Sequence, residues 1–289
     1  MEKLIIRNMK KKKGKNEKMR SIDKEKKRYF SVVAIRSVFI IAGIFLWEYS
    51  ASSGSYNPIF TSYPSQILKD LMVFFTSGEL YKHASITLTE VFWGLFFGSA
   101  IGILLAIVFG YFSFIGEIIT PIISAISCIP QLALAPVYVL WFGLGLTSKI
   151  FLAGLMVFFN VFSATYGAIK SMDKGILESA NLLGASHFQT LRTVVIPSCM
   201  PWILSGLRGG VSAALVGAII GEYIGSKGGF GWMITYSTSY FNISRVMSCI
   251  VILLFVGLGL NKILDIMEQK LLVWRTVTSL RMENLKNQD

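Results

Sequence analysis

The chain has 289 residues, of which 53% are hydrophobic and only 15% are charged. Because a soluble domain of this size carries about a quarter charged residues, this composition excludes an ordinary water-soluble protein and indicates one polytopic membrane domain. The net charge of +12 is concentrated in residues 1–36, which hold 14 Lys and Arg against 4 Asp and Glu. A basic tail beside an apolar run favours cytoplasmic retention and contact with anionic lipid over nucleic-acid binding.

The start of the chain is predicted to be a tail followed by a first membrane span. Residues 1–28 are expected to form a disordered cytoplasmic tail, and residues 29–47 form the first apolar run. Small residues after this run would also suit a signal-peptide cleavage site. Because the basic region is unusually long and further spans follow, a retained transmembrane helix is the favoured interpretation.

An amphipathic helix is predicted in the outer segment 50–84, with Pro64 in its first turn. Lys69 and Asp70 fall on one side of this helix. The other side is apolar and consists of Ile67, Leu68, Leu71, Met72, Phe74 and Phe75. Such a helix is expected to lie along the membrane surface or to pack on the helical bundle.

Three further spans are predicted over residues 85–110, 117–142 and 150–168. In the first of these three, glycine recurs every four residues and lets a neighbouring helix approach closely. These glycines are Gly94, Gly98 and Gly102. Prolines interrupt the middle one and release backbone carbonyls that protein or water must satisfy. These prolines are Pro121, Pro130 and Pro136.

Two last spans are predicted over residues 201–221 and 246–266, with a glycine- and aromatic-rich outer loop at 222–242 between them. Basic residues after the final span indicate that the C-terminal tail, residues 276–289, is cytoplasmic. The fold class is therefore an all-α, polytopic membrane helical bundle with six transmembrane helices and both termini in the cytoplasm.

A polar region separates the fourth and fifth spans, and we call residues 171–197 the polar loop. Asp173 can cap a first helix, and Gly184 stands where a helix-ending residue with positive φ belongs. The apolar face of this helix is predicted to consist of Ile176, Leu177, Ala180 and Leu183.

A second helix is predicted to start at once, because Ser186 and Gln189 have the spacing of a capping box. Pro197 is expected to end it. Its apolar stripe consists of Phe188, Leu191, Val194 and Val195. Two short helices around a tight corner could form a rigid knob for a partner protein, or a re-entrant surface loop without a partner.

The polar loop resembles the cytoplasmic "EAA" loop of ABC-importer permeases. That pattern reads E-A-A, three residues, G, nine residues and I-x-L-P. Here Glu178-Ser179-Ala180 is followed after three residues by Gly184, and after nine more by Val-Val-Ile-Pro at 194–197. The substitutions are conservative, and they keep the acid, the corner glycine and Pro197.

Further motifs occur in the family's order, and the resemblance covers roughly residues 60–275. They are Pro64-Ser65, Ser77-Gly78-Glu79-Leu80, Trp141-Phe142-Gly143-Leu144-Gly145 and Ser148-Lys149-Ile150-Phe151. Together they resemble the nitrate/sulfonate/taurine-type branch, which also includes importers of thiamine-pyrimidine precursors. The permease transmembrane domain is accordingly placed at residues 29–275.

The resemblance implies a permease subunit of the cell membrane that works as a homodimer with two ATP-binding subunits and an external substrate-binding protein. It assigns ATPase coupling to five residues of the polar loop: Glu178, Ser179, Ala180, Gly184 and Pro197. The chain has no G-x4-G-K-[ST] phosphate loop, so ATP would be bound and hydrolysed by a partner. No catalytic residue, cofactor or metal site is expected in this chain.

Polar residues inside spans are candidates for the translocation path, although each could instead be structural. These candidates are Glu90, Gln131, Asn160, Arg208 and Glu222. Two histidines far apart in sequence make a metal site improbable, and the three single cysteines (Cys128, Cys199, Cys249) are expected to be buried.

The sequence also argues against three other functions. A secondary transporter is disfavoured because no internal repeat is found, and a channel because no filter-like loop is found. An intramembrane enzyme would need paired acids, a histidine cluster or a Ser/His set within its spans, and the two histidines are predicted to lie outside them.

Overall fold

The computed structural model describes residues 28, 30–53 and 60–272. Regular structure in these ranges is entirely helical, which confirms the predicted all-α class. The chain divides into two compact units, residues 1–68 and 69–289. The predicted tails lie outside the described residues, apart from Arg28.

The first unit contains the predicted first span as an apolar helix, Phe30–Ser52. Two hydrogen bonds attach the end of this helix to the chain that follows. The Trp47 indole N–H donates to the Ser62 carbonyl oxygen (2.9 Å), and the Ser65 hydroxyl donates to the Glu48 carboxylate (2.8 Å).

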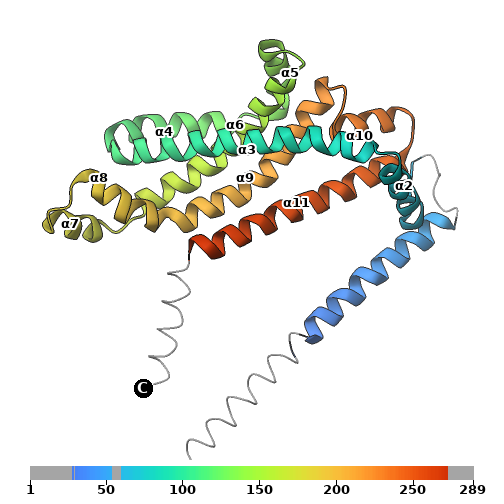
Figure 1. Cartoon of the computed structure of the whole chain (residues 1–289), viewed down its shortest axis with the longest axis horizontal. Coiled ribbons are helices and arrows are strands. Elements are labelled where there is room, and N and C mark those ends of the chain that lie inside the picture. The colour runs from blue at the N-terminus through green and yellow to red at the C-terminus, as the bar shows by residue number, and fades with distance from the viewer. Residues whose placement is uncertain (1–27, 29, 54–59, 273–289) are drawn as a thin grey trace, which may run out of the picture. The chain divides into compact units, whose positions relative to one another are not determined.

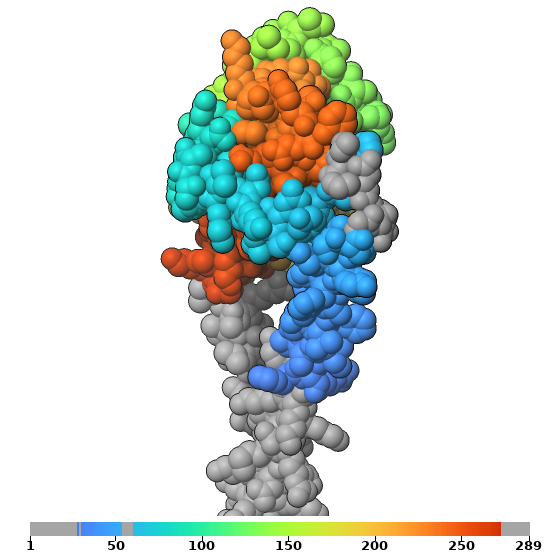
Figure 2. Space-filling view, turned by 90° about the vertical axis from the view of Figure 1, so that its right-hand side faces the viewer, coloured from blue at the N-terminus to red at the C-terminus, as the bar shows by residue number. Residues whose placement is uncertain are grey.

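The second unit is built on four long helices that run side by side in Figure 1. They are α3 (Glu79–Tyr111), α6 (Leu146–Lys170), α9 (Ile196–Gly225) and α11 (Ile243–Leu271). The short helices of the polar loop lie at one end of these four, which we call the loop end. The short helix α10 (Phe230–Ser239) lies at the other, the α10 end, onto which Figure 2 looks.

Glycines allow α3 and α6 to pack closely, as predicted. A β-carbon on Gly94 would lie 2.6 Å from the Ala153 β-carbon, and one on Gly98 would lie 2.3 Å from the Gly154 carbonyl oxygen. Any side chain at these two positions would push the helices apart. Beside this contact, buried valines and alanines of α3, α6 and α9 form the core, for example Val91.

The third predicted span is not a straight helix. It consists of α4 (Ser113–Ser127) and α5 (Gln131–Phe142), which are bent by 96°. Pro130 stands at the break, because it has no N–H to donate and holds the preceding backbone away from helical angles. The described residues therefore contain five apolar spans, or six if the bent pair counts as one.

The outer loop predicted at 222–242 is also corrected. Helix α9 continues to Gly225, and α10 forms most of the remainder. Phe230 and Met233 of α10 are buried against Phe74 and Cys249. This tertiary packing stabilises a helix in a segment whose glycines predict a loop.

Helix α2 (Pro64–Thr76) starts at Pro64 as predicted, but its two sides are assigned wrongly. Phe74 is buried, whereas Met72 and Phe75 are 68% and 56% exposed. Asp70, expected on the polar side, keeps only 13% of its side chain exposed because Arg245 of α11 pairs with it. The cysteine prediction fails at Cys128, which is exposed at the end of α4, and holds for the other two.

Candidate functional site

The cap and the corner predicted for the first half of the polar loop are present. Helix α7 (Lys174–Leu182) begins after Asp173, whose carboxylate accepts a backbone N–H of the first turn (2.8 Å). The chain then turns at Gly184, where φ is 77°, an angle that glycine adopts without strain. The Ala185 N–H donates to the Ala180 carbonyl (3.1 Å) and closes the helix end.

The second half starts with the predicted capping box. The Gln189 N–H donates to the Ser186 hydroxyl (3.3 Å), and the Ser186 N–H donates to the Gln189 side-chain oxygen (2.8 Å). Helix α8 (His187–Thr190) follows, and a π-helical turn, η1 (Leu191–Val195), joins it to α9. The corner between α7 and α8 is therefore fixed by caps on both sides.

The predicted end of this helix at Pro197 is wrong. Helical structure runs from His187 to Gly225, and Pro197 is the second residue of α9. In the π-helical turn before it, the Ile196 N–H donates to the carbonyl of Leu191, five residues back. The wider turn and the position near the start of α9 accommodate a ring that would crowd a regular helix interior.

Apolar side chains project from the corner of the polar loop. Leu182, Leu183 and Phe188 are 89%, 88% and 70% exposed, and we call these three residues the loop tip. Glu178 and Ser179 are exposed beside it, and Ala180 is half-buried. The sequence did not single out the loop tip, although two leucines directly before a corner glycine are a signal for it.

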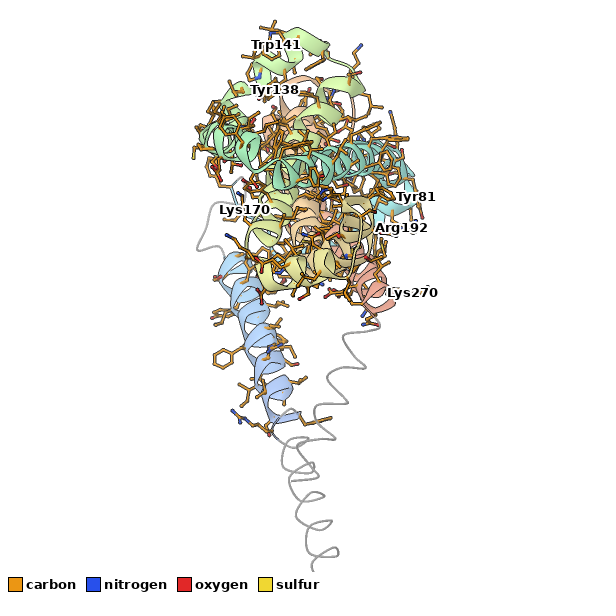
Figure 3. All side chains as sticks on the ribbon, turned by 90° about the vertical axis from the view of Figure 1, so that its left-hand side faces the viewer. Tyr81, Tyr138, Trp141, Lys170, Arg192 and Lys270 are labelled. Atoms are coloured by element: carbon orange, nitrogen blue, oxygen red, sulfur yellow. The ribbon has the colours of Figure 1, made fainter. Side chains whose placement is uncertain are left out.

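The single apolar face predicted for α7 is not formed. Leu177 and Ala180 are half-buried, whereas Ile176 and Leu183 are exposed. Figure 3 looks from the loop end and labels Lys170, Arg192 and Lys270, which come from α6, η1 and α11. The loop end thus offers an exposed apolar tip together with exposed acidic and basic groups.

A second feature is a polar strip on the exposed sides of α6 and α9, which pack against each other. It consists of Asn160 and Ser163 of α6 and Ser205, Gly209 and Ser212 of α9, all exposed, and we call it the polar face. Asn160 and Gly209 are adjacent, because a β-carbon on Gly209 would lie 3.3 Å from the Asn160 side-chain oxygen.

Many other exposed positions on the spans carry large apolar side chains, which suit contact with lipid. Examples are Phe92, Phe96 and Leu104 of α3, and Leu254, Phe255 and Leu258 of α11. The polar face therefore differs in chemistry from these apolar surfaces of α3 and α11.

The structure places Arg208 and Gln131 in contacts within the protein. The Arg208 guanidinium donates to Asp265 and Glu268 of α11, each at 2.7 Å, and all three side chains are partly exposed. The Gln131 side-chain oxygen accepts the Tyr138 hydroxyl (2.9 Å) beside the bend between α4 and α5.

Glu90 and Glu222, the other two predicted path residues, meet in a buried cluster toward the α10 end. Both side chains are 1% exposed. The Glu222 carboxylate accepts the Thr87 hydroxyl (2.7 Å) and the Gly231 N–H (2.5 Å). Glu222 thus ties α9 to α3 and to the start of α10.

Lys149 was missed as a member of this cluster. It is 3% exposed, and its ammonium donates to the carbonyls of Leu144 (2.8 Å), Gly145 (3.0 Å) and Gly225 (3.0 Å). Sequence reasoning used Lys149 only as part of a motif, because nothing local shows that the end of α9 supplies a carbonyl. His83 is also buried, and it accepts the Gly229 N–H.

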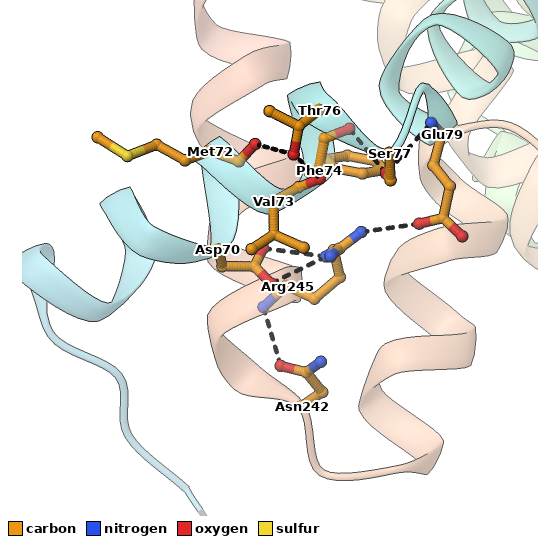
Figure 4. Close-up of polar contacts among 9 residues, drawn as sticks. All are labelled: Asp70, Met72, Val73, Phe74, Thr76, Ser77, Glu79, Asn242 and Arg245. Carbon is orange, nitrogen blue, oxygen red and sulfur yellow. Dashed lines mark hydrogen bonds and ion pairs between the residues drawn. The ribbon is translucent and has the colours of Figure 1, made fainter.

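Arg245 organises the same end of the second unit (Figure 4). Its guanidinium contacts Asp70 of α2 (2.9 Å) and Glu79 of α3 (3.1 Å), and it lies 4.2 Å from the centre of the Phe74 ring. One side chain of α11 therefore connects α2, α3 and α11.

The sequence matches the family described as "Binding-protein-dependent transport system inner membrane component" over residues 98–273. This range contains the polar loop, the polar face and the spans that carry them. The chain belongs to this family.

Curated relatives agree with the assignment to these permeases. A probable ABC transporter permease of Haemophilus influenzae is 31% identical and covers 78% of this chain and 92% of its own length. The taurine transport system permease protein TauC of Escherichia coli is 30% identical and covers 79% and 85%. The formylaminopyrimidine transport permease protein ThiX of Halalkalibacterium halodurans is 30% identical and covers 83% and 95%.

Solved structures share the fold of this permease. A chain of the inward-facing MetNI methionine ABC transporter aligns with a TM-score of 0.58 at 20% identity, covering 66% of this chain and 95% of that chain. A chain of an amino acid ABC transporter solved with histidines aligns with a TM-score of 0.56 at 20% identity, covering 73% and 100%.

The chain is therefore a multi-pass permease component of an ABC-type import system in the cell membrane. Permeases of this kind work with ATPase and substrate-binding protein partners.

Proposed function

We propose that the permease works as a homodimer in ATP-driven import of a small solute, with its polar loops docked on two ATP-binding subunits. The observation that carries this proposal is the loop tip. Leu182, Leu183 and Phe188 are all at least 70% exposed on a corner that two caps hold rigid. Burial of such side chains in a partner groove would be favourable, whereas their exposure to water is not.

The coupling roles assigned to the polar loop fit its geometry. Gly184 sets the corner through its positive φ, and the carbonyl of the small residue Ala180 accepts the Ala185 N–H that closes the helix end. Glu178 is exposed and free to meet a basic residue of the partner, while Ser179 bonds its own helix through the Gly175 carbonyl (2.7 Å). Pro197 marks the junction of the π-helical turn with α9, through which displacement of the polar loop would reach the spans.

We further propose that the polar face lines the translocation path between two copies of the permease. Exposed amide and hydroxyl groups on a span are unfavourable in hydrocarbon and suit a water-filled passage or a protein contact. Asn160 is the strongest predicted path residue on this face. Arg208 precedes Gly209 on α9 and is held by α11, so its assigned role is to shape the path.

The solute class that we propose is a small sulfonate, taurine-like compound or aminopyrimidine precursor. Two of the relatives named above are permeases for taurine and formylaminopyrimidine, each 30% identical. Another relative, from Bacillus subtilis and 29% identical, is described as a putative aliphatic sulfonates transport permease. The chain would perform no catalysis, and ATP would be bound by the partner subunits.

Transport by the full complex tests the proposal. The permease, with the ATP-binding and solute-binding proteins that co-purify with it, is reconstituted in vesicles with labelled taurine, ethanesulfonate or aminopyrimidine outside. We expect uptake of one class that needs ATP inside and the binding protein outside. Uptake that follows an ion gradient without ATP would overturn the proposal in favour of a secondary transporter or channel.

A further inference from the structure

Helix α4 carries a line of polar side chains that is separate in sequence from the polar face. Positions 113, 117, 120, 124 and 127 follow one another at alternating steps of four and three residues, which places them on one side of the helix. We call these residues the α4 stripe: Ser113, Glu117, Thr120, Ser124 and Ser127. Thr120 is half-buried, and the other four are exposed.

The opposite side of α4 is apolar. Ile118 and Ile122 are 53% and 54% exposed, and Phe114 is 77% exposed. Because an α-helix turns by about 100° per residue, Ile122 points roughly 200° away from Ser124 at nearly the same depth in the span. The apolar side suits contact with lipid, whereas the α4 stripe suits water or protein.

A backbone group on the α4 stripe also lacks its usual helical partner. Pro121 lies inside α4 and has no N–H to donate to the carbonyl of Glu117, four residues earlier. A carbonyl released in this way within a span is tolerated where water or protein satisfies it. The Ser127 hydroxyl donates to the Ser124 carbonyl (2.7 Å), whereas the Ser124 hydroxyl has no partner among the described residues. Both the released carbonyl and this hydroxyl can therefore bond water.

An ion pair shows which neighbour the α4 stripe faces. The Glu117 carboxylate lies 3.6 Å from the ammonium of Lys170, the last residue of α6, which is labelled in Figure 3. A β-carbon on Gly116 would lie 2.9 Å from the Tyr166 hydroxyl, so the start of α4 packs on the same end of α6. Both charged side chains are partly exposed, so their pairing adds little stability. It does fix the direction of the α4 stripe, toward α6.

The polar face extends along α6 to this ion pair. Asn160, Ser163, Gly167 and Lys170 follow one another at steps of three, four and three residues, and all four are exposed on one side of α6. A β-carbon on Gly167 would have no heavy atom within 4 Å, so this side of α6 is open at that point. A polar surface thus runs from α9 across α6 to α4.

We propose that the α4 stripe forms a further wall of the translocation path, beside the polar face. The two surfaces contact the same water, and the Glu117 carbonyl and the Ser124 hydroxyl offer hydrogen bonds to a hydrated solute that passes. The side of α4 that carries Ile122 contacts lipid. The inference rests on the proposed import function and deepens it, because it assigns path residues to a helix on which sequence analysis placed none.

Water access to introduced cysteines tests this inference in the assembled transporter. Ser124→Cys is compared with Ile122→Cys in a Cys128→Ser background, because Cys128 is exposed beside the α4 stripe whereas the other two cysteines are buried. The probe is a charged methanethiosulfonate, which reacts with thiolates and is excluded from hydrocarbon. In membranes opened on both sides, we expect Ser124→Cys to react at least about tenfold faster than Ile122→Cys, because lipid disfavours the thiolate.

Three further measurements complete the test. Ser163→Cys reports on the polar face alone and is expected to react about as fast as Ser124→Cys. Ser127→Cys repeats the measurement on the α4 stripe where Ser124→Cys fails to fold. In vesicles, Ser124→Phe should slow ATP-driven import several-fold by narrowing the path, whereas Ile122→Phe should leave it unchanged. Equal import by these two variants would overturn the α4 wall.

The labelling outcomes separate the α4 wall from the proposed function. Fast labelling of Ser163→Cys, with Ser124→Cys as slow as Ile122→Cys, overturns the α4 wall and leaves the polar face in the path. Slow labelling at every position overturns both. Labelling of Ser124→Cys only after detergent separates the copies overturns the wall and makes the α4 stripe a contact between copies. Fast labelling of Ser124→Cys together with import that needs no ATP supports the wall and overturns the proposed energy source.

Discussion

Replacing Gly184 by valine tests the corner of the polar loop without touching the spans. Gly184 has φ of 77°, and no heavy atom lies within 4 Å of the position its β-carbon would take. The substitution therefore meets no steric clash, and its cost comes from the backbone angle alone. Positive φ costs a residue with a β-carbon about 1–2 kcal/mol, with a β-branched residue at the upper end.

A penalty of this size lowers the population of the native corner by roughly 5- to 30-fold. The loop tip sits on both sides of this corner, so its three apolar side chains would rarely hold the arrangement that fits a partner. We expect ATP-driven import and ATPase stimulation by the binding protein to fall by a similar factor in reconstituted vesicles. The melting temperature of the purified permease should change little, because Gly184 makes no contact with the bundle.

Two controls sharpen the Gly184 experiment. Gly184→Asn should retain most activity, because asparagine tolerates positive φ better than other residues with a β-carbon. Gly259→Val places the same side chain on α11, at a helical glycine with nothing within 4 Å, and should be neutral. Full import and normal ATPase stimulation by Gly184→Val would refute the coupling role of the corner.

Three further predictions concern the bundle. Arg245→Gln leaves the Asp70 carboxylate, 13% exposed, without its cation and should destabilise the permease by about 3 kcal/mol in thermal unfolding. Adding Asp70→Asn removes the unpaired charge and should restore part of the lost stability. If stability is not restored, the loss comes from the missing contact of the Arg245 guanidinium with the Phe74 ring. Gly98→Leu should force α3 from α6 and lower stability by roughly 3 kcal/mol or more, whereas Gly167→Leu, with open space around it, should not. Asn160→Leu should reduce import about tenfold with ATPase binding intact, and an unchanged import rate would remove Asn160 from the path.

Features fixed by neighbouring residues were predictable from the sequence. The Asp173 cap, the Ser186 and Gln189 capping box and the positive φ of Gly184 depend only on short-range backbone chemistry. The packing glycines were also predictable, because the spacing of Gly94 and Gly98 places them on one side of a helix. The family pattern around Glu178 uses this same local information.

Features that depend on distant partners were not predictable. Asp70 is largely withdrawn from solvent because Arg245, 175 residues later, pairs with it, and α10 is helical because Phe230 packs on Phe74. Lys149 needs the Gly225 carbonyl, 76 residues away, before it becomes part of the buried cluster. A single sequence gives the polarity of these residues but not which of them meet.

Pro197 shows a different limit of sequence reasoning. Proline usually ends a helix because it lacks a donor and crowds the preceding turn. Here a π-helical turn precedes it, so the helix continues into α9. The π-helical turn removes the conflict between the proline ring and the preceding turn. The residues around Pro197 carry no pattern that predicts such a turn.

Cross-linking from the loop tip tests most directly that the polar loop is the docking site for the ATP-binding subunits. Leu183→Cys, at a position 88% exposed, is compared with Tyr240→Cys, 69% exposed after α10, in the Cys128→Ser background. In intact membranes containing the assembled transporter, a short bifunctional maleimide should join Leu183→Cys to an ATP-binding subunit and leave Tyr240→Cys unjoined to it. Cross-linking of the ATP-binding subunit through Tyr240→Cys, with none through Leu183→Cys, would contradict the account.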